Sequence, residues 1–197
     1  MDKNEEIESE AISSQSDKSE LEQLVSAGAH GGFELKKGEK RRFLGEFKER
    51  IIKVLTFEQV EEAGVYPEVL AAIRDVKADK LIIRQEAVQE SAQEYIDLAR
   101  ENNLSFKKVS SPDLKGEIAL AVASDEAVEV DQIEVVTRED KFAKLGLPIE
   151  LIEKTGQRIC ADCYQQLVEK APEEEINFRK MSWLDKLFSN DCVCQQE

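Results

Sequence analysis

Short apolar runs that alternate with helical patterns constrain the fold of this chain more than any other feature. Five segments are typical of strands, because they are brief, contain β-branched or aromatic apolar residues and are separated by turns or helical patterns. They span residues 50–55, 80–84, 105–109, 118–124 and 132–136. The fourth is continuously apolar, which predicts a central strand, and the fifth is expected at an edge. This alternation predicts an α/β fold, with helices packed on a mixed four- to five-stranded sheet.

Helical signals fill the gaps between these runs. Thr56 and Gln59 form a capping box, and Pro67 occupies a favoured first helical position. Residues 86–101 carry the clearest amphipathic stripe of the chain. Toward the C-terminus, helices are expected over 138–145, with Thr137 as the N-cap, and over 148–154.

Charge and length limit the class of protein. The 197 residues include 27 Lys and Arg against 42 Asp and Glu, which gives a net charge of −15. No apolar run approaches the ~18 residues of a membrane helix, and the acidic N-terminus lacks a signal-peptide core. We therefore expect a cytoplasmic protein without membrane contact. Its expected parts are a disordered acidic tail over 1–18, an α/β domain over 19–136 and a helical module over 137–197 with two cysteine pairs.

Positive charge is concentrated between residues 34 and 53, where eight bases and four acids leave a net charge of +4. One interpretation is a solvated surface segment with ion pairs, and the other is a contact for an anionic partner, RNA or an acidic protein. The acidity of the whole chain argues against broad non-specific binding of nucleic acid. The candidate partner-binding residues are Lys36, Lys37, Lys40, Arg41, Arg42, Lys48 and Arg50.

Aromatic and apolar residues are interleaved with these bases. Phe43, Leu44 and Phe47 have spacings that allow one helical face, so we expect them to point inward. Lys40, Arg41 and Arg42 are expected to be largely exposed and to give one face a positive potential.

All four cysteines lie in two close pairs, Cys160 with Cys163 and Cys192 with Cys194. Four thiolates match the ligand number of a structural zinc site, and a reducing compartment disfavours stable disulfides. The pairs therefore predict one Zn²⁺ bound by all four residues. Ordinary reduced thiols and a redox-active pair are the alternatives. The two-residue gap between Cys160 and Cys163 is by itself a weak thioredoxin-like signal.

The stretch over residues 38–51, Gly-Glu-Lys-Arg-Arg-Phe-Leu-Gly-Glu-Phe-Lys-Glu-Arg-Ile, followed by Leu55-Thr56, resembles the signature of the YueI family of Gram-positive bacteria. Tyr-Ile-Asp-Leu-Ala over 95–99 and Gly-Glu-Ile-Ala-Leu-Ala over 116–121 fit the same family. The resemblance spans about residues 20–136. It implies a small α/β sandwich similar to chorismate-mutase-like and ribosomal-protein-like folds. It implies no reaction, because the family has no established function.

Known catalytic signatures are not recognisable in the sequence. It contains no phosphate-binding loop, nucleophile elbow or His-based metal motif, and its single histidine excludes a His-dependent triad. We therefore expect a non-catalytic binding or regulatory protein with a macromolecular partner, and predict no oligomeric state. The alternatives are an RNA- or ribosome-associated factor, by fold analogy alone, and a thiol redox-responsive protein that uses the C-terminal cysteines.

Overall fold

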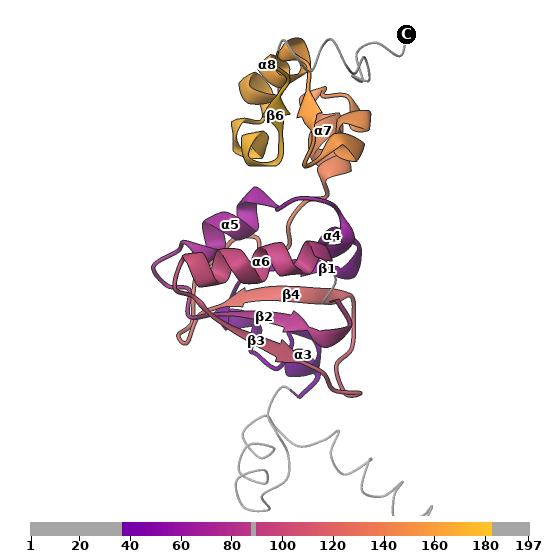
Figure 1. Ribbon diagram of the computed structural model, residues 1–197. Coiled ribbons are helices and arrows are strands. Elements are labelled where there is room, and N and C mark those ends of the chain that lie inside the picture. Colours follow the sequence, from indigo (N-terminus) through magenta and orange to yellow (C-terminus); the bar gives the residue numbers. More distant parts are fainter. Residues whose placement is uncertain (1–36, 88–89, 183–197) are drawn as a thin grey trace, which may run out of the picture. The chain divides into compact units, whose positions relative to one another are not determined.

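The structure, a computed structural model, describes residues 37–87 and 90–182 (Figure 1). The described residues from Glu39 to residue 182 belong to one compact unit. Up to residue 123, the elements are α3 (Lys37–Arg42), η1 (Lys48–Arg50), β1 (Ile51–Thr56), α4 (Phe57–Glu61), α5 (Pro67–Ile73), β2 (Lys80–Arg84), η2 (Gln85–Ala87), α6 (Glu90–Glu101), β3 (Ser105–Val109) and β4 (Ile118–Ala123). They are followed by α7 (Arg138–Leu145), η3 (Ile149–Lys154), β5 (Arg158–Ile159), α8 (Ala161–Lys170), η4 (Pro172–Asn177) and β6 (Arg179–Lys180).

The main sheet has four strands in the order β1-β4-β2-β3. β4 runs antiparallel to both of its neighbours, whereas β2 and β3 are parallel and are joined through α6. All six residues of β4 are buried, as a strand with apolar residues on both faces requires. The predicted mixed α/β sheet with a central fourth strand is therefore confirmed.

Two apolar layers cover the two faces of this sheet. Helices α4, α5 and α6 lie on one face, and the chain around α3 lies on the other (Figure 1). The helix side includes Leu55, Tyr95 and Leu120, while Phe43 and Leu44 pack with the opposite side of the strands. Because helices and loop fill both faces, the open parts of the sheet are its edges.

The local signals at two helix starts are confirmed. The Thr56 side chain accepts a hydrogen bond from the Gln59 backbone amide, and the Gln59 side chain bonds back to the Thr56 amide. Pro67 is the first residue of α5. Thr137 caps α7, and Gly146 ends it in the left-handed conformation with a φ of 62°.

The prediction of an edge strand over 132–136 is wrong. The segment makes a single bridge to the sheet, between Val54 and Glu134, and the Val54 amide donates to the Ile133 carbonyl at 2.9 Å. Elsewhere along this segment, side chains supply the hydrogen bonds that a paired strand would receive from the backbone of β1. Lys53 Nζ bonds to the Gln132 carbonyl, and Gln59 Nε2 donates to the Val135 carbonyl at 2.9 Å.

The chain after α3 also departs from the expected helical face. Phe43 and Leu44 are buried as predicted, but α3 ends at Arg42, and Leu44 has a positive φ of 55°. Phe47 is only partly buried. The two inward side chains are thus placed by a reversal of the backbone rather than by helical spacing. The helix expected over 148–154 is present as a 3₁₀ helix, Ile149–Lys154.

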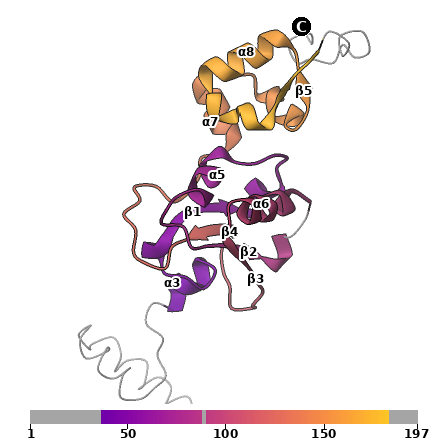
Figure 2. The ribbon, with the colours of Figure 1, turned by 60° about the vertical axis from the view of Figure 1, so that its left-hand side comes forward.

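Residues 137–182 build a separate apolar core from α7, η3, α8 and the short parallel pair β5 and β6 (Figure 2). Phe142, Leu151 and Leu167 are fully buried in it. We call residues 137–182 the C-terminal module. Within the described residues, no helix combines the length and apolarity that a bilayer span requires.

Buried charges join the C-terminal module to the α/β domain. The Arg138 side chain is 0% exposed and donates to Glu62 Oε2 at 3.0 Å and to the Ala63 carbonyl at 2.9 Å. Its Nε lies 3.5 Å from Oε2 of Glu174, whose side chain is also 0% exposed. Lys141 Nζ bonds to Glu68 and Glu174, each at 3.0 Å. These contacts tie α7 and η4 to the chain on either side of residue 65.

Candidate functional site

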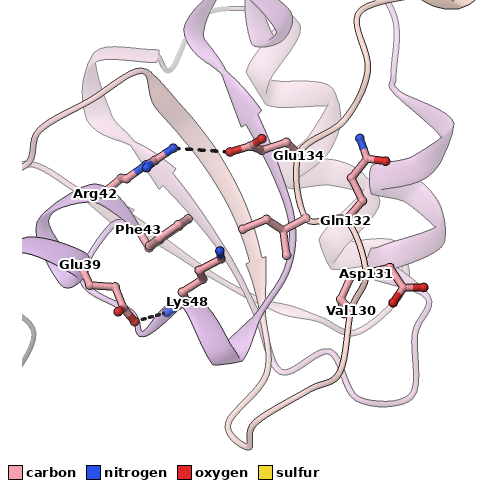
Figure 3. Close-up of a pocket in the computed structure, with 9 residues that line it drawn as sticks. Glu39, Arg42, Phe43, Lys48, Val130, Asp131, Gln132 and Glu134 are labelled. Atoms are coloured by element: carbon pink, nitrogen blue, oxygen red, sulfur yellow. Dashed lines mark hydrogen bonds and ion pairs between the residues drawn. The ribbon is translucent and has the colours of Figure 1, made fainter.

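A hollow of about 470 Å³ opens beside β1, between the chain that follows α3 and the segment 130–134 (Figure 3). Its lining combines two bases, three acids and several apolar side chains. The lining residues are Glu39, Arg42, Phe43, Lys48, Val130, Asp131, Gln132, Ile133 and Glu134. All of them lie in the compact unit that begins at Glu39.

One wall of the hollow is held in place by the turn after α3. Leu44 and Gly45 both have positive φ values, which reverse the chain, and Phe43 and Leu44 anchor the turn in the core. Glu39 Oε1 accepts a hydrogen bond from the Lys48 amide at 2.7 Å and so closes the loop (Figure 3). The aromatic floor and the Lys48 side chain are therefore carried by a turn with fixed ends.

The opposite wall is the irregular segment that covers the outer edge of β1. The Val54–Ile133 hydrogen bond holds its centre against β1. Gln132 and Asp131 are exposed. Only part of the edge of β1 is covered, which leaves the hollow open to solvent.

The electrostatics of the hollow are mixed. Arg42 Nη2 lies 3.5 Å from Glu134 Oε1, and the two side chains are 62% and 65% exposed. Pairs this exposed contribute only about 0–1 kcal/mol, so a partner group can replace either member at small cost. Lys48 extends its ammonium toward the space beside Phe43 (Figure 3). An apolar floor with both charge signs around it suits a polypeptide segment better than a polyanion.

The predicted basic surface is only partly assembled. Arg42 and Lys48 meet at the hollow and are exposed. Arg41, in contrast, is half-buried and pairs with Asp113 at 3.3 Å. Lys40 is also half-buried, with its Nζ 4.6 Å from the centre of the Phe47 ring. The expectation that three consecutive bases are all exposed is therefore wrong, since pairing and stacking cover two of them.

Two other candidates are not among the residues that line the hollow. Lys37 is exposed, and the guanidinium of Arg50 stacks 5.9 Å from the Phe47 ring. Lys36 lies outside the described residues. The acids Asp131 and Glu134 were not anticipated as site residues. The strand-like pattern over 132–136 contains Glu134 and follows Asp131, but it predicts an edge strand and not which edge of the sheet.

The first cysteine pair lies at the start of α8. Cys160 is the N-cap, and its Sγ accepts from the Cys163 amide at 3.4 Å. Cys160 is partly exposed and Cys163 is buried. Cys192 and Cys194 lie outside the described residues, and the described part of the chain holds no group of three or more metal-ligating side chains. The predicted zinc site therefore stays a prediction.

Comparison with known proteins finds relatives of the α/β domain. The family described as "Protein of unknown function (DUF1694)" matches residues 18–134. The uncharacterized protein YueI of Bacillus subtilis (strain 168) is 28% identical over 113 residues, which cover 57% of this chain and 86% of that protein. The crystal structure of YueI from Bacillus subtilis aligns with a TM-score of 0.50 and 26% identity, covering 61% of this chain and 94% of the other. Both alignments leave a large share of the chain unmatched.

Proposed function

Since the chain belongs to the YueI family (DUF1694), a family of unknown function, we propose from its own geometry that it is a non-catalytic cytoplasmic binding or regulatory protein. It contacts a partner protein through the hollow beside β1. Arg42 and Lys48 supply the positive groups of this contact, and Phe43 supplies its apolar floor.

The single observation that carries this proposal is the exchangeable pair between Arg42 and Glu134 above Phe43. Both side chains are more than half exposed, and their separation of 3.5 Å is long for an ion pair. A carboxylate of a partner can therefore take the place of Glu134 on Arg42, while a partner lysine can pair with Glu134. A polypeptide with both charge signs uses both groups at once.

The RNA-associated alternative has less support at this site. Three carboxylates, those of Glu39, Asp131 and Glu134, line the hollow against two bases. Phosphates brought into the hollow would meet these acids, and nucleic-acid binding depends on the net neutralisation of phosphate. The mixed lining favours a protein partner.

Site-specific photo-crosslinking tests the proposal. A photoreactive residue placed at Gln132, on the wall of the hollow, is expected to capture a protein in cells, and the same residue at the exposed Lys77 is not. The captured protein, once purified, should bind the wild-type chain. Arg42→Glu combined with Lys48→Glu should weaken that binding by roughly tenfold or more, because like charges now face each other.

Two results would contradict the proposal. Capture of RNA in place of protein from Gln132 would favour the RNA-associated alternative. Equal binding of the purified partner by the wild-type chain and the double charge reversal would remove the hollow from the contact. Lys77→Glu serves as the matched control, since it also reverses an exposed lysine but lies outside the hollow lining.

A further inference from the structure

The two edge strands of the main sheet differ in how they are covered. The outer side of β1 receives the segment around Ile133. β3, at the other border of the sheet, pairs with β2 alone (Figure 1). Every second residue of an edge strand directs its N–H and C=O groups away from the sheet. Within residues 37–87 and 90–182, no backbone hydrogen bond reaches this outer side of β3.

The side chains of β3 leave this edge accessible. Four of the five residues, from Ser105 to Lys108, are exposed, and only Val109 is partly buried. Phe106 is 36% exposed, and the Arg100 guanidinium stacks 4.9 Å from the centre of its ring. A strand laid along β3 would therefore meet open backbone groups and the Phe106 ring, on which the Arg100 guanidinium is stacked.

The local charge of β3 is opposite to that of the chain. Residues 102–112 contain Lys107 and Lys108 and no acid, in a chain with a net charge of −15. The register places Lys107 beside Ile82 and Lys108 beside Ile83, so the two ammonium groups lie on opposite faces of the sheet. A neighbouring strand would meet a positive charge on each of its own faces.

We propose that β3 accepts an extended acidic segment of a partner protein as an added strand. Strand addition supplies backbone hydrogen bonds, while the side chains beside the new strand supply selectivity. Acids on both faces of the added strand would pair with Lys107 and Lys108. The site is independent of the hollow beside β1, because the two lie at opposite edges of the sheet.

The same two lysines argue against a second copy of this chain as the occupant. Antiparallel pairing of β3 with itself about Lys107 would place Lys107 opposite its own copy. Like charges in directly opposed positions destabilise a strand pair. Lysines on edge strands protect proteins from unwanted pairing with other strands in this way. An acidic strand, in contrast, is attracted to them.

Amide exchange of the full chain tests the proposal with two synthetic peptides as probes. The first peptide alternates Val with pairs of Glu, and the second has the same sequence with an N-methyl group on every residue, which removes the N–H donors from both edges of the strand. The first should slow hydrogen exchange at residues 105–109 and shift their amide resonances. The second should bind roughly tenfold or more weakly, since it keeps the charge but loses backbone donors.

Variants separate this site from the hollow. Lys107→Glu combined with Lys108→Glu should abolish protection of β3 by the acidic peptide. The melting temperature of this double variant should stay close to that of the wild type, because both side chains are exposed. Arg42→Glu combined with Lys48→Glu should leave that protection unchanged. Equal binding of the two peptides would reduce the contact to charge attraction and overturn the proposal. Protection of β3 that depends on protein concentration without peptide would also overturn it, in favour of a second copy.

Discussion

The side-chain amide of Asn177 pairs with the backbone of Val65 in both directions. The Val65 amide donates to Asn177 Oδ1, and Asn177 Nδ2 donates to the Val65 carbonyl, each at 2.8 Å. The two residues are 112 positions apart in the chain, and both are buried. Asn177 thus acts toward Val65 as a neighbouring strand would, and it fixes η4 of the C-terminal module to the chain before α5.

Asn177→Ala is expected to destabilise the protein by about 2–4 kcal/mol. The change removes both hydrogen bonds to Val65, and also the bond from Asn177 Nδ2 to Glu174 Oε2. It leaves the Val65 N–H and C=O buried without partners, and each such group costs roughly 1–3 kcal/mol. Chemical denaturation followed by circular dichroism measures the loss. Asn102→Ala is the control, since Asn102 makes one partly buried bond to the Leu98 carbonyl and should cost about 1 kcal/mol or less. Equal losses for the two variants would contradict the bridging role of Asn177.

Gly64, next to Val65 in the chain, leaves room for the Asn177 side chain because it has no Cβ. Its φ is +78°, and a Cβ at this position would lie 2.5 Å from Thr155 Cγ2 and 2.6 Å from Asn177 Oδ1. Gly64→Ala should therefore add a steric clash to backbone strain. Gly156 provides a matched control, because its φ is +81° and a Cβ there would meet nothing within 4 Å.

We expect Gly156→Ala to cost about 1 kcal/mol, from strain alone, and Gly64→Ala about 2–4 kcal/mol. Thermal and chemical unfolding of both variants measures the difference. A difference near zero would mean that the C-terminal module moves to accommodate the methyl group, so its contact with the α/β domain would be loose.

Features of the fold that depend on nearby residues were predictable, and those that join distant segments were not. The Thr56–Gln59 capping box and the apolar run of β4 are local patterns with direct structural consequences. The burial of Arg138 and the pairing of Asn177 with Val65 have no local pattern, since a base or an amide is ordinarily exposed. For the same reason the sequence indicated Arg42 and Lys48 as site residues but not Glu134 opposite them.

Lys141 should make the stability of the fold depend on pH in the acid range through its ion pair with Glu173. Lys141 Nζ lies 2.9 Å from the Glu173 carboxylate. Partial burial alone would raise the pKa of Glu173, but the hydrogen bond and the charge of Lys141 hold that pKa below its ordinary value of 4.5. A carboxyl whose pKa is lower in the folded state stabilises the fold above its unfolded pKa. That contribution is lost as the pH falls through the folded pKa.

Lys141→Gln is therefore expected to raise the pKa of Glu173 toward 4.5 and to flatten the fall in stability below about pH 4.5. Carbon NMR of the Glu173 carboxyl reports the pKa, and urea unfolding at a series of pH values reports the stability. Lys144→Gln, an exposed change on the same helix, is the control. An unchanged Glu173 pKa in the Lys141 variant would contradict the assigned cause.

Replacing one member of the buried Arg138–Glu174 pair should cost more than replacing both. Both side chains are 0% exposed, and Arg138→Met leaves the Glu174 carboxylate with less compensation in the interior. We expect a loss of about 3–5 kcal/mol for this variant, and partial recovery when Glu174→Leu is added. Double-mutant analysis of unfolding free energies measures the coupling. A double variant with the summed loss of the two single changes would show that the charges do not depend on each other.

The start of α8 supports a test of the zinc prediction. Cys160 caps the helix and accepts from the Cys163 amide, so both thiols belong to the first turn of one helix. We propose that they supply two ligands of a structural Zn²⁺ and that Cys192 and Cys194 supply the other two. Metal binding would then add to the folding free energy of the C-terminal module.

Metal analysis of protein purified under reducing conditions should find about one zinc ion per chain. Cys160→Ser should lose the metal and lower the melting temperature of the C-terminal module. Asp162→Asn, a change between the two cysteines that retains all four thiols, should keep the metal. A chelator should destabilise the wild type and leave the stability of the Cys160 variant unchanged, because only the wild type has a metal to lose. Metal-free protein that forms a reversible disulfide between Cys160 and Cys163 would contradict the zinc site and favour the redox-responsive alternative.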